Sequence, residues 1–548
     1  MNTNRVRTAL TALVLAGSGV LVTGPSADAG PGTGPGTGPG TGPGAGPGTG
    51  PAATAAATPL QELVPQPVQI QPHPDITFTL TQTAKIQIAT DTARKPAELL
   101  ASILRPSTGY DLQITDSVTG DGVVLLNNAD PKVGNEGYQL DVTPKQVIIR
   151  ANAAAGHFNG IASLRQLLPP KAEAKTKQPG PWTVPGASIL DYPRYQHRGA
   201  MLDVARHFFT PDQVKRYIDQ IAAFKINYFH LHLSDDQGWR LEIKSWPELT
   251  KIGGSTEVGG RKGNLFYTQD QYKDLVAYAQ NRGITVIPEF DMPGHTNAAL
   301  ASYAELNCDG KKRPLYTGTD VGFSSLCISK DVTYKFIEDV VKEVSAITPG
   351  PYFHIGGDEA LSTPDADFVK FMNRVLPIVK KYGKVTTGWH EFIKTTTDTA
   401  PIPQFWGTET SDANVAAAAK RGNKVLMSPA NRIYLDMKYN KNTKLGQDWA
   451  GLVEVKTAYG WNPGAYLSGV GEASIRGVEA PLWTETIKTS ADIEYMAFPR
   501  LPVAAELGWS TAATHSWDKF APRLGAQAPR WKVQGINYYA STQVPWKK

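Results

Sequence analysis

The 548-residue sequence contains only two cysteines and has no strong excess of charge of either sign. Its formal net charge of +5 becomes +3 without Arg5 and Arg7, which is too little to argue for nucleic acid or an anionic membrane as a partner. After its first 30 residues the chain has no apolar run long enough to span a bilayer. We therefore expect a protein that binds neither nucleic acid nor membrane.

The two cysteines, Cys308 and Cys327, lie in one loop-like region. A cysteine metal site is not expected, because companion cysteines at ligand spacing are missing. In an oxidising compartment the pair should form a disulfide that closes a loop of about 20 residues and contributes a few kcal/mol. The alternative is two free buried thiols.

Residues 1–29 have the features of a secretory signal peptide. Arg5 and Arg7 precede a mostly apolar stretch, and Ala27-Asp28-Ala29 is a cleavage site of small residues. Residues 30–58 are a low-complexity segment rich in Gly, Pro and Thr, a composition that cannot form a core. We expect a secreted, extracellular protein whose folded part follows a disordered linker.

Residues 59–193 change in pattern and predict a small α+β domain. Residues 76–80 and 84–88 alternate between polar and apolar side chains, as half-buried strands do. Residues 137–142 and 146–150 flank a turn-forming segment and predict a hairpin, and residues 160–168 have helical spacing. No chemistry is concentrated here, so we expect a supporting role.

From residue 194 to 548, strand-like and helix-like segments alternate. This order is typical of an α/β fold, and eight candidate strands favour a (β/α)8 TIM barrel. An active site would then lie at the carboxyl ends of the strands. The candidate strands are residues 199–204, 226–233, 284–289, 352–357, 385–388, 404–406, 424–427 and 477–483.

Carboxylates and tryptophans follow these strands repeatedly. The fourth strand runs through two glycines into Asp358 and Glu359, which could also be a solvated strand end or, for Asp358, a helix cap. Four tryptophans near the same ends are difficult to explain as core. Aromatic faces pack on the CH face of a sugar, while carboxylates and arginine bind its hydroxyls, so a carbohydrate pocket is predicted. These tryptophans are Trp389, Trp406, Trp449 and Trp483.

The segment His354-Ile355-Gly356-Gly357-Asp358-Glu359 resembles the signature of the family 20 glycoside hydrolases, the β-N-acetylhexosaminidases. The resemblance covers the whole barrel, and residues 60–193 are similar to the small domain that precedes the barrel in that family. Further matching segments are Arg206-His207-Phe208, residues 230–237, residues 288–295, Gly388-Trp389, Trp406-Gly407, Tyr434-Leu435-Asp436 and Trp483-Thr484-Glu485.

The resemblance implies an exo-acting enzyme that removes terminal non-reducing β-linked GlcNAc, and GalNAc as well, from an oligosaccharide or glycoconjugate with retention. The nucleophile would be the substrate's own 2-acetamido oxygen, which forms an oxazolinium intermediate. Glu359 would be the general acid and base. Asp358 would hold the acetamido N–H, and Tyr434 would donate to its oxygen.

The resemblance also assigns the remaining pocket residues, and it implies no cofactor and no metal. We further expect His295 to pair with Asp291 and to tune Glu359, although a purely structural histidine is the alternative. Implied substrate contacts are Trp389, Trp406 and Trp483 around the acetamido methyl group, Arg206, Asp436 and Glu485 on hydroxyls, Asp235 as support or ligand, and Trp449 stacked on the next residue.

Three other functions compete with this one. His230 and His232 at a strand end resemble the paired ligands of metal-dependent amidohydrolases, although that class has them on the first strand. A chitinase also acts on N-acetylglucosamine, but its Asp-x-x-Asp-x-Asp-x-Glu strand is absent. A non-catalytic sugar-binding barrel is the third, and the intact Glu359 argues against it.

Overall fold

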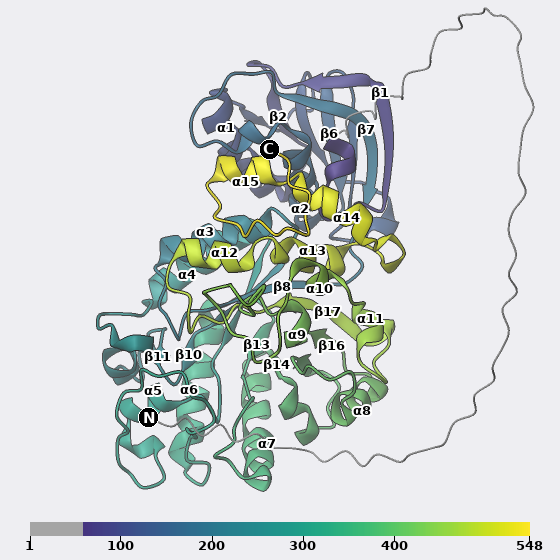
Figure 1. Cartoon of the computed structure of the whole chain (residues 1–548). Coiled ribbons are helices and arrows are strands. Elements are labelled where there is room, and N and C mark those ends of the chain that lie inside the picture. The colour runs from purple at the N-terminus through teal and green to yellow at the C-terminus, as the bar shows by residue number, and fades with distance from the viewer. Residues whose placement is uncertain (1–58) are drawn as a thin grey trace, which may run out of the picture. The chain divides into compact units, whose positions relative to one another are not determined.

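The computed structural model describes residues 59–548. The predicted signal peptide and linker, residues 1–58, lie outside the described residues. The described chain forms a sheet domain followed by a barrel (Figure 1). Within it, no helix is both long and apolar enough to cross a membrane.

The sheet domain is a mixed sheet of seven strands among the described residues, in the order β1-β7-β5-β6-β4-β2-β3. The predicted hairpin is present, and Leu140 pairs with Ile149 across it. The predicted helix begins six residues earlier than expected, and Gly160 in it packs so closely on Ile149 that a Cβ would lie 2.5 Å away. The elements are β1 (Gln69–Thr79), β2 (Lys85–Ile88), α1 (Arg94–Thr108), β3 (Ile114–Thr115), β4 (Gly122–Leu126), β5 (Tyr138–Val142), β6 (Gln146–Ala151), α2 (Ala154–Leu167) and β7 (Thr183–Asp191).

The second part is a closed barrel of eight parallel strands within the described residues, as predicted. These strands are short and buried on both faces, which explains why they appear in the sequence as apolar runs rather than as alternating patterns. The strands are β8 (His197–Asp203), β9 (Tyr228–His232), β12 (Thr285–Glu289), β13 (Tyr352–His354), β14 (Val385–Trp389), β15 (Ile402–Phe405), β16 (Val425–Met427) and β17 (Ile475–Ala480).

Local sequence signals start the outer helices. Thr210 and Gln213 form a capping box at one helix, and Thr268 and Gln271 form another. A short hairpin, β10 (Ser234–Asp235) and β11 (Gly238–Trp239), follows β9. The helices are α3 (Pro211–Ala222), α4 (Gln269–Gln280), α5 (Asn297–Ser302), α6 (Asp331–Ile347), α7 (Asp365–Lys381), α8 (Ala413–Arg421), α9 (Ala430–Ile433), α10 (Val455–Tyr459), α11 (Pro463–Tyr466), α12 (Ser490–Ala497), α13 (Arg500–Trp509), α14 (Trp517–Gly525) and α15 (Ala528–Gln534).

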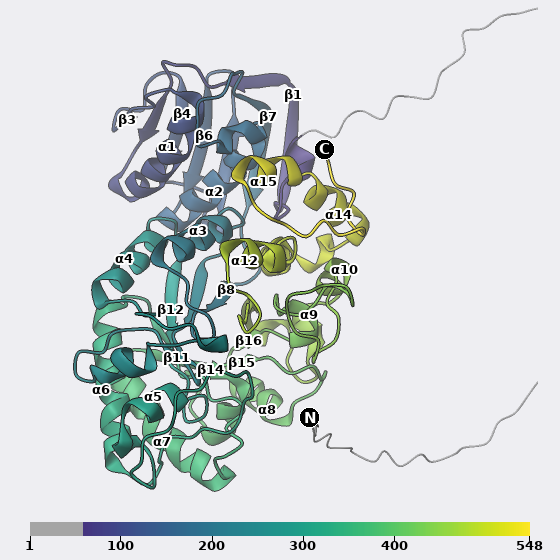
Figure 2. The ribbon, with the colours of Figure 1, turned by 60° about the vertical axis from the view of Figure 1, so that its left-hand side comes forward.

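The chain returns to the sheet domain at its C-terminal end, where α14 and α15 lie beside α2 (Figure 2). Arg523 donates to the backbone oxygen of Leu63, and a buried ion pair of 2.7 Å joins Lys225 to Asp191. Lys225 precedes β9, so this contact lies at the amino end of the barrel strand. The sheet domain therefore packs away from the carboxyl ends, where the candidate site lies.

Candidate active site

A cavity of about 420 Å³ opens at the carboxyl ends of the barrel strands. Most of the predicted site residues form its wall, although they come from four strand ends and a long loop that are far apart in sequence. The wall consists of Arg206, Thr319, Val321, Asp358, Glu359, Trp406, Tyr434, Asp436, Gln447, Trp449, Trp483 and Glu485. Trp389, Asp235, Asp291 and His295 lie behind it and are fully buried.

The carboxylate pair follows β13 through a turn that only glycine permits. Gly356 and Gly357 have φ values of 63° and 98°, and a Cβ on Gly356 would lie 1.8 Å from an oxygen of Asp291. Glu359 also has a positive φ, 43°, a conformation that costs about 1–3 kcal/mol in a non-glycine residue. Such strain often marks functional sites.

Neither alternative holds for Asp358. Asp358 is only 8% exposed, so it is not a solvated strand end. It is also not a helix cap, because α7 begins at Asp365 with Pro364 at its N-cap. Burial, reinforced by the charge of Glu359 and opposed by that of His295, raises the pKa of Asp358 to about 6. Such a carboxyl changes its charge close to neutral pH.

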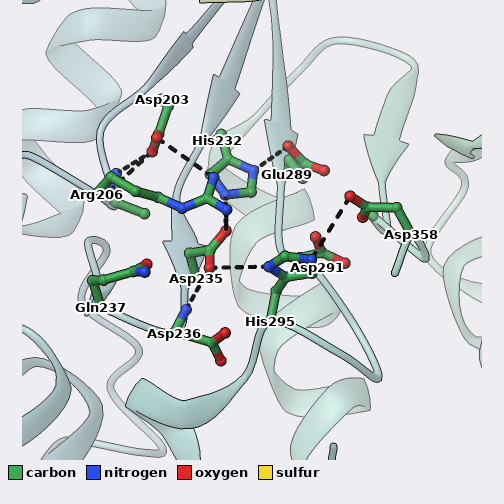
Figure 3. A network of polar contacts seen from close by, with 12 residues as sticks. Asp203, Arg206, His232, Asp235, Asp236, Gln237, Glu289, Asp291, His295 and Asp358 are labelled. Carbon is green, nitrogen blue, oxygen red and sulfur yellow. Dashed lines mark hydrogen bonds and ion pairs between the residues drawn. The ribbon is translucent and has the colours of Figure 1, made fainter. Parts of the chain in front are cut away.

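His295 bridges Asp235 and the carboxylate pair, and Figure 3 shows it between Asp235 and Asp358. Its Nδ1 atom lies 3.1 Å from Asp235, and its Nε2 atom lies 3.4 Å from Glu359 and 3.8 Å from Asp358. Burial opposes a charge on this ring, but Asp235 and Asp358 outweigh burial and raise the pKa of His295 well above its ordinary value. His295 therefore presents an imidazolium to the pair.

The prediction that His295 pairs with Asp291 is wrong. Asp291 instead accepts a hydrogen bond of 2.9 Å from the backbone N–H of Gly357 and interacts with Asp358. Burial, and next the charge of Asp358, raise the pKa of Asp291 well above its usual range. Asp291 therefore keeps its proton, can donate it to Asp358, and favours the ionised form of Asp358.

Aromatic rings enclose the inner part of the cavity. The rings of Trp389 and Trp483 lie 5.6 Å apart, and that of Tyr434 lies 6.4 Å from Trp483. Trp389 is fully buried and packs against Trp483, which lines the cavity, so its contact with an acetamido methyl group stays a prediction. Burial, with Asp358 and Asp436 nearby, raises the pKa of Tyr434 well above its usual value, so its phenol stays available as a donor.

Arg206 is held rigidly at the other side of the cavity. Its guanidinium lies 2.9 Å from Asp235 and 3.5 Å from Asp203, and it stacks on Trp483 with 4.8 Å to the ring centre. Asp235 is thus a buried support and not a wall residue. Burial and the charge of Glu485 raise the pKa of Asp436, and burial raises the pKa of Glu485. Arg206 and these two carboxyl groups can hydrogen-bond the hydroxyl groups of a ligand.

Four residues at the site received no role from the sequence. Thr319 and Val321 come from the loop closed by Cys308 and Cys327, whose predicted disulfide is confirmed, and Gln447 comes from the loop after β16. Glu391 accepts a 3.0 Å hydrogen bond from the indole of Trp406, and burial followed by the charge of Asp358 raises the pKa of Glu391 to about 8. Of these four residues, only Glu391 could have been predicted from the sequence, because it follows a predicted strand end.

His230 and His232 do not form an open metal site at the mouth. His232 interacts with Glu289 through Nδ1 and lies 2.8 Å from Asp235 through Nε2, and His230 lies 2.7 Å from Glu479. His230, Glu289 and His354 are close enough to share a cation, yet their facing atoms already contact one another. The amidohydrolase alternative requires ligands that face the substrate, and these residues lie in the barrel interior.

Comparison with known proteins gives the same picture for the whole described chain. Residues 195–512 match the model "Glycosyl hydrolase family 20, catalytic domain", and residues 60–192 match its domain 2. A beta-N-acetylhexosaminidase of Cellulomonas fimi is 38% identical over 489 residues, 88% of this chain and 97% of that protein.

Two solved structures are also similar. A GH20 beta-N-acetylhexosaminidase from Streptomyces coelicolor A3(2) is 54% identical, covers 89% of this chain and 99% of its own, and gives a TM-score of 0.87. A mutant beta-hexosaminidase of Streptomyces plicatus, in complex with its product GlcNAc, is 54% identical with the same TM-score and covers 90% of this chain and 99% of its own.

A barrel that sets a carboxylate pair beside an aromatic, hydroxyl-binding pocket has the architecture of a glycoside hydrolase. The family match covers both the barrel and the sheet domain before it. This chain belongs to glycosyl hydrolase family 20.

Proposed function

We propose that this enzyme is an exo-acting β-N-acetylhexosaminidase that hydrolyses terminal non-reducing β-linked GlcNAc, and GalNAc as well, from oligosaccharides or glycoconjugates. The cavity of about 420 Å³ suits one terminal sugar. Arg206 and Asp436, which are buried, and Glu485, which is half-buried, form part of its wall and offer charged groups to the hydroxyls of that sugar. The names of its relatives, beta-N-acetylhexosaminidase and beta-hexosaminidase, support the acetamido sugar.

In the first step, Glu359 gives its proton to the glycosidic oxygen while the bond from that oxygen to C1 breaks. The 2-acetamido oxygen of the same sugar forms a new bond to C1, and the leaving group departs as an alcohol. Asp358 accepts a hydrogen bond from the acetamido N–H and balances the positive charge of the oxazolinium ring. Tyr434 donates a hydrogen bond to the acetamido oxygen. The pocket holds this nucleophile in the reacting geometry. That orientation supplies most of the rate advantage of an intramolecular nucleophile.

In the second step, a water molecule attacks C1 and gives a proton to the Glu359 carboxylate. The bond between C1 and the acetamido oxygen breaks, and its electrons return to the amide. Two displacements at one carbon restore the original configuration, so the product is the β-anomer.

The observation that supports this mechanism best is the common contact of both carboxylates with one atom. Asp358 and Glu359 lie 3.8 Å and 3.4 Å from Nε2 of His295, so they approach from one side of the site. An acid and a protein nucleophile must act on opposite sides of the anomeric carbon. A neighbouring acid–carboxylate pair instead suits a nucleophile that the substrate brings.

The test is hydrolysis of an aryl β-N-acetylglucosaminide followed by ¹H NMR before mutarotation. The proposal expects the β-anomer first and no sugar attached to the protein. An α-anomer, or an ester between a sugar and a carboxylate in the mass spectrum of the quenched enzyme, refutes it.

We also propose that the chain is exported. The disulfide between Cys308 and Cys327 is typical of an oxidising compartment and supports this. N-terminal sequencing of the protein from the culture medium tests it. A mature chain that begins after Ala29 is expected, and retention in the cytoplasm with Met1 contradicts it.

A further inference from the structure

Glu289 is a buried carboxylate at the carboxyl end of β12 and does not line the cavity. Figure 3 shows it beside His232. Its register partners are His232 on β9 and His354 on β13, so three side chains meet at one level of the barrel. The mechanism above does not use it. Its two oxygens nevertheless contact two different parts of the active site.

One oxygen leads to the general acid. Oε2 of Glu289 interacts with His232, whose other nitrogen lies 2.8 Å from Asp235. Asp235 lies 3.1 Å from His295, which in turn lies 3.4 Å from Glu359. A continuous chain of polar contacts therefore runs from Glu289 to the group that handles the proton.

The other oxygen leads to the base of the aromatic pocket. Oε1 of Glu289 accepts a hydrogen bond of 2.9 Å from the indole N–H of Trp389. The Trp389 ring lies 5.6 Å from that of Trp483, which is on the cavity wall. The orientation of the ring below the sugar pocket thus depends on the same carboxylate.

The charge of Glu289 is compensated within the barrel. Burial alone would favour a neutral carboxyl, but His232, His354 and His230 surround it and hold its pKa well below the ordinary value. Nε2 of His230 lies 2.9 Å from it, and the two carboxylates beside that ring raise the pKa of His230 to about 9 against its burial. A buried anion that is fully paired is a rigid acceptor in two directions.

We propose that Glu289 is a positioning residue that couples the two halves of the catalytic machinery. It fixes the His232–Asp235–His295 chain behind Glu359 and at the same time fixes Trp389 below the acetamido group. Loss of Glu289 therefore disturbs proton transfer and acetamido recognition together. This proposal rests on the proposed function.

The test compares Glu289→Gln with Glu479→Gln, the matched control. Both carboxylates are completely buried and both bind His230. The other side-chain partners of Glu479 among the described residues are His197 and Gln404, not His232 or Trp389. An amide has one oxygen, so it cannot accept from His232 and Trp389 at once. Both variants are first checked for wild-type far-UV circular dichroism and thermal unfolding.

Two readouts separate the two halves. The dependence of kcat/KM on leaving-group pKa across aryl N-acetylglucosaminides reports the acid, and the affinity of a thiazoline analogue of the intermediate reports the acetamido pocket. In Glu289→Gln we expect both kcat/KM and the affinity for the thiazoline to fall about 10-fold, the size typical of residues that support a site from behind. The dependence of kcat/KM on leaving-group pKa should also become steeper. Glu479→Gln is expected to change each less than about twofold. A loss in only one readout, or equal losses in both variants, overturns the coupling.

If Glu289→Gln does not fold, Trp389→Phe replaces it, because it removes the N–H but keeps a ring. The coupling predicts a steeper leaving-group dependence in this variant although Trp389 does not contact Glu359. If Trp389→Phe binds the thiazoline more weakly but keeps the wild-type dependence of kcat/KM on leaving-group pKa, the coupling is overturned. Failure of the proposed function is distinct, because wild-type enzyme would then neither hydrolyse the aryl substrates nor bind the thiazoline.

Discussion

Nε2 of His295 lies 3.4 Å from a carboxylate oxygen of Glu359, in a chain segment where His295 itself has a positive φ of 55°. Asp235, on the other ring nitrogen, holds the proton of the imidazole in place. In the proposed mechanism, the imidazolium stabilises the carboxylate that remains after Glu359 has given up its proton. The same contact keeps that carboxylate in position for the water of the second step.

Replacing Glu359 by Gln should remove the general acid while leaving the shape of the pocket intact. We expect kcat/KM for the disaccharide GlcNAc-β-1,4-GlcNAc to fall by about 10³-fold, the range of positioned acid–base groups. Binding of GlcNAc, measured by calorimetry, should remain detectable because Arg206, Asp436 and Glu485 are untouched. Near-wild-type turnover of the disaccharide contradicts the acid role.

The substrate should be inert without its acetamide. An aryl β-glucoside fits the hydroxyl contacts but brings no nucleophile, and oriented intramolecular groups accelerate reactions by large factors. We expect kcat/KM at least about 10³-fold below that of the matched N-acetylglucosaminide. A trifluoroacetamido substrate is the control, since its weaker amide oxygen should give an intermediate rate. Equal rates for the two parent sugars rule out assistance by the substrate.

Activity should fall in mild acid because of Asp358. This carboxyl acts in its ionised form, and its pKa of about 6 lies above the ordinary value, so it gains a proton as the pH falls through 6. With that pKa, about 90% is ionised at pH 7 and about 10% at pH 5, and kcat/KM should follow this fraction.

The Asp358→Asn variant tests that assignment. It should lose about 10²–10³-fold in kcat, as expected when a group that stabilises developing charge is removed. Its remaining activity should no longer fall near pH 6. If kcat/KM of Asp358→Asn still falls near pH 6 as it does in the wild type, another group is responsible for the titration.

The sequence predicted the barrel because buried parallel strands appear as short apolar runs, and it predicted the pair because glycines must precede a turn as tight as that at Gly356. It could not choose the partner of His295, since Asp235 and Asp291 both follow strand ends and only the β10–β11 hairpin decides which one reaches the ring. It also missed Thr319 and Val321, because a long loop without periodicity gives no signal for where it folds back.

Removing the disulfide should loosen one wall of the cavity. Cys308 and Cys327 close the loop that carries Thr319 and Val321 to the site. The Cys308→Ser/Cys327→Ser variant should lose about 3 kcal/mol of stability, the entropy expected for a loop of this length. Urea unfolding measures the loss, and KM for the disaccharide should rise several-fold. Unchanged stability and KM together show that the loop holds its place without the bond.

Trp449 should act on the second sugar and not on the first. It is 55% exposed at the rim of the cavity, and its ring meets Trp406 and Tyr434 edge-on, at 5.9 Å and 6.1 Å. Its free face is therefore open to a ring that leaves the cavity. Aromatic stacking is worth about 1 kcal/mol, so Trp449→Ala should raise KM for the disaccharide roughly 5- to 10-fold.

The same variant should bind the thiazoline analogue, which has no second sugar, within about twofold of wild type. Leu452→Ala is the matched control, because Leu452 is an exposed apolar residue of the same loop that does not line the cavity. It should change neither measurement. If Trp449→Ala weakens the thiazoline as much as the disaccharide, its ring supports the first sugar through Tyr434 and Trp406, and the platform for a second sugar must lie elsewhere on the rim.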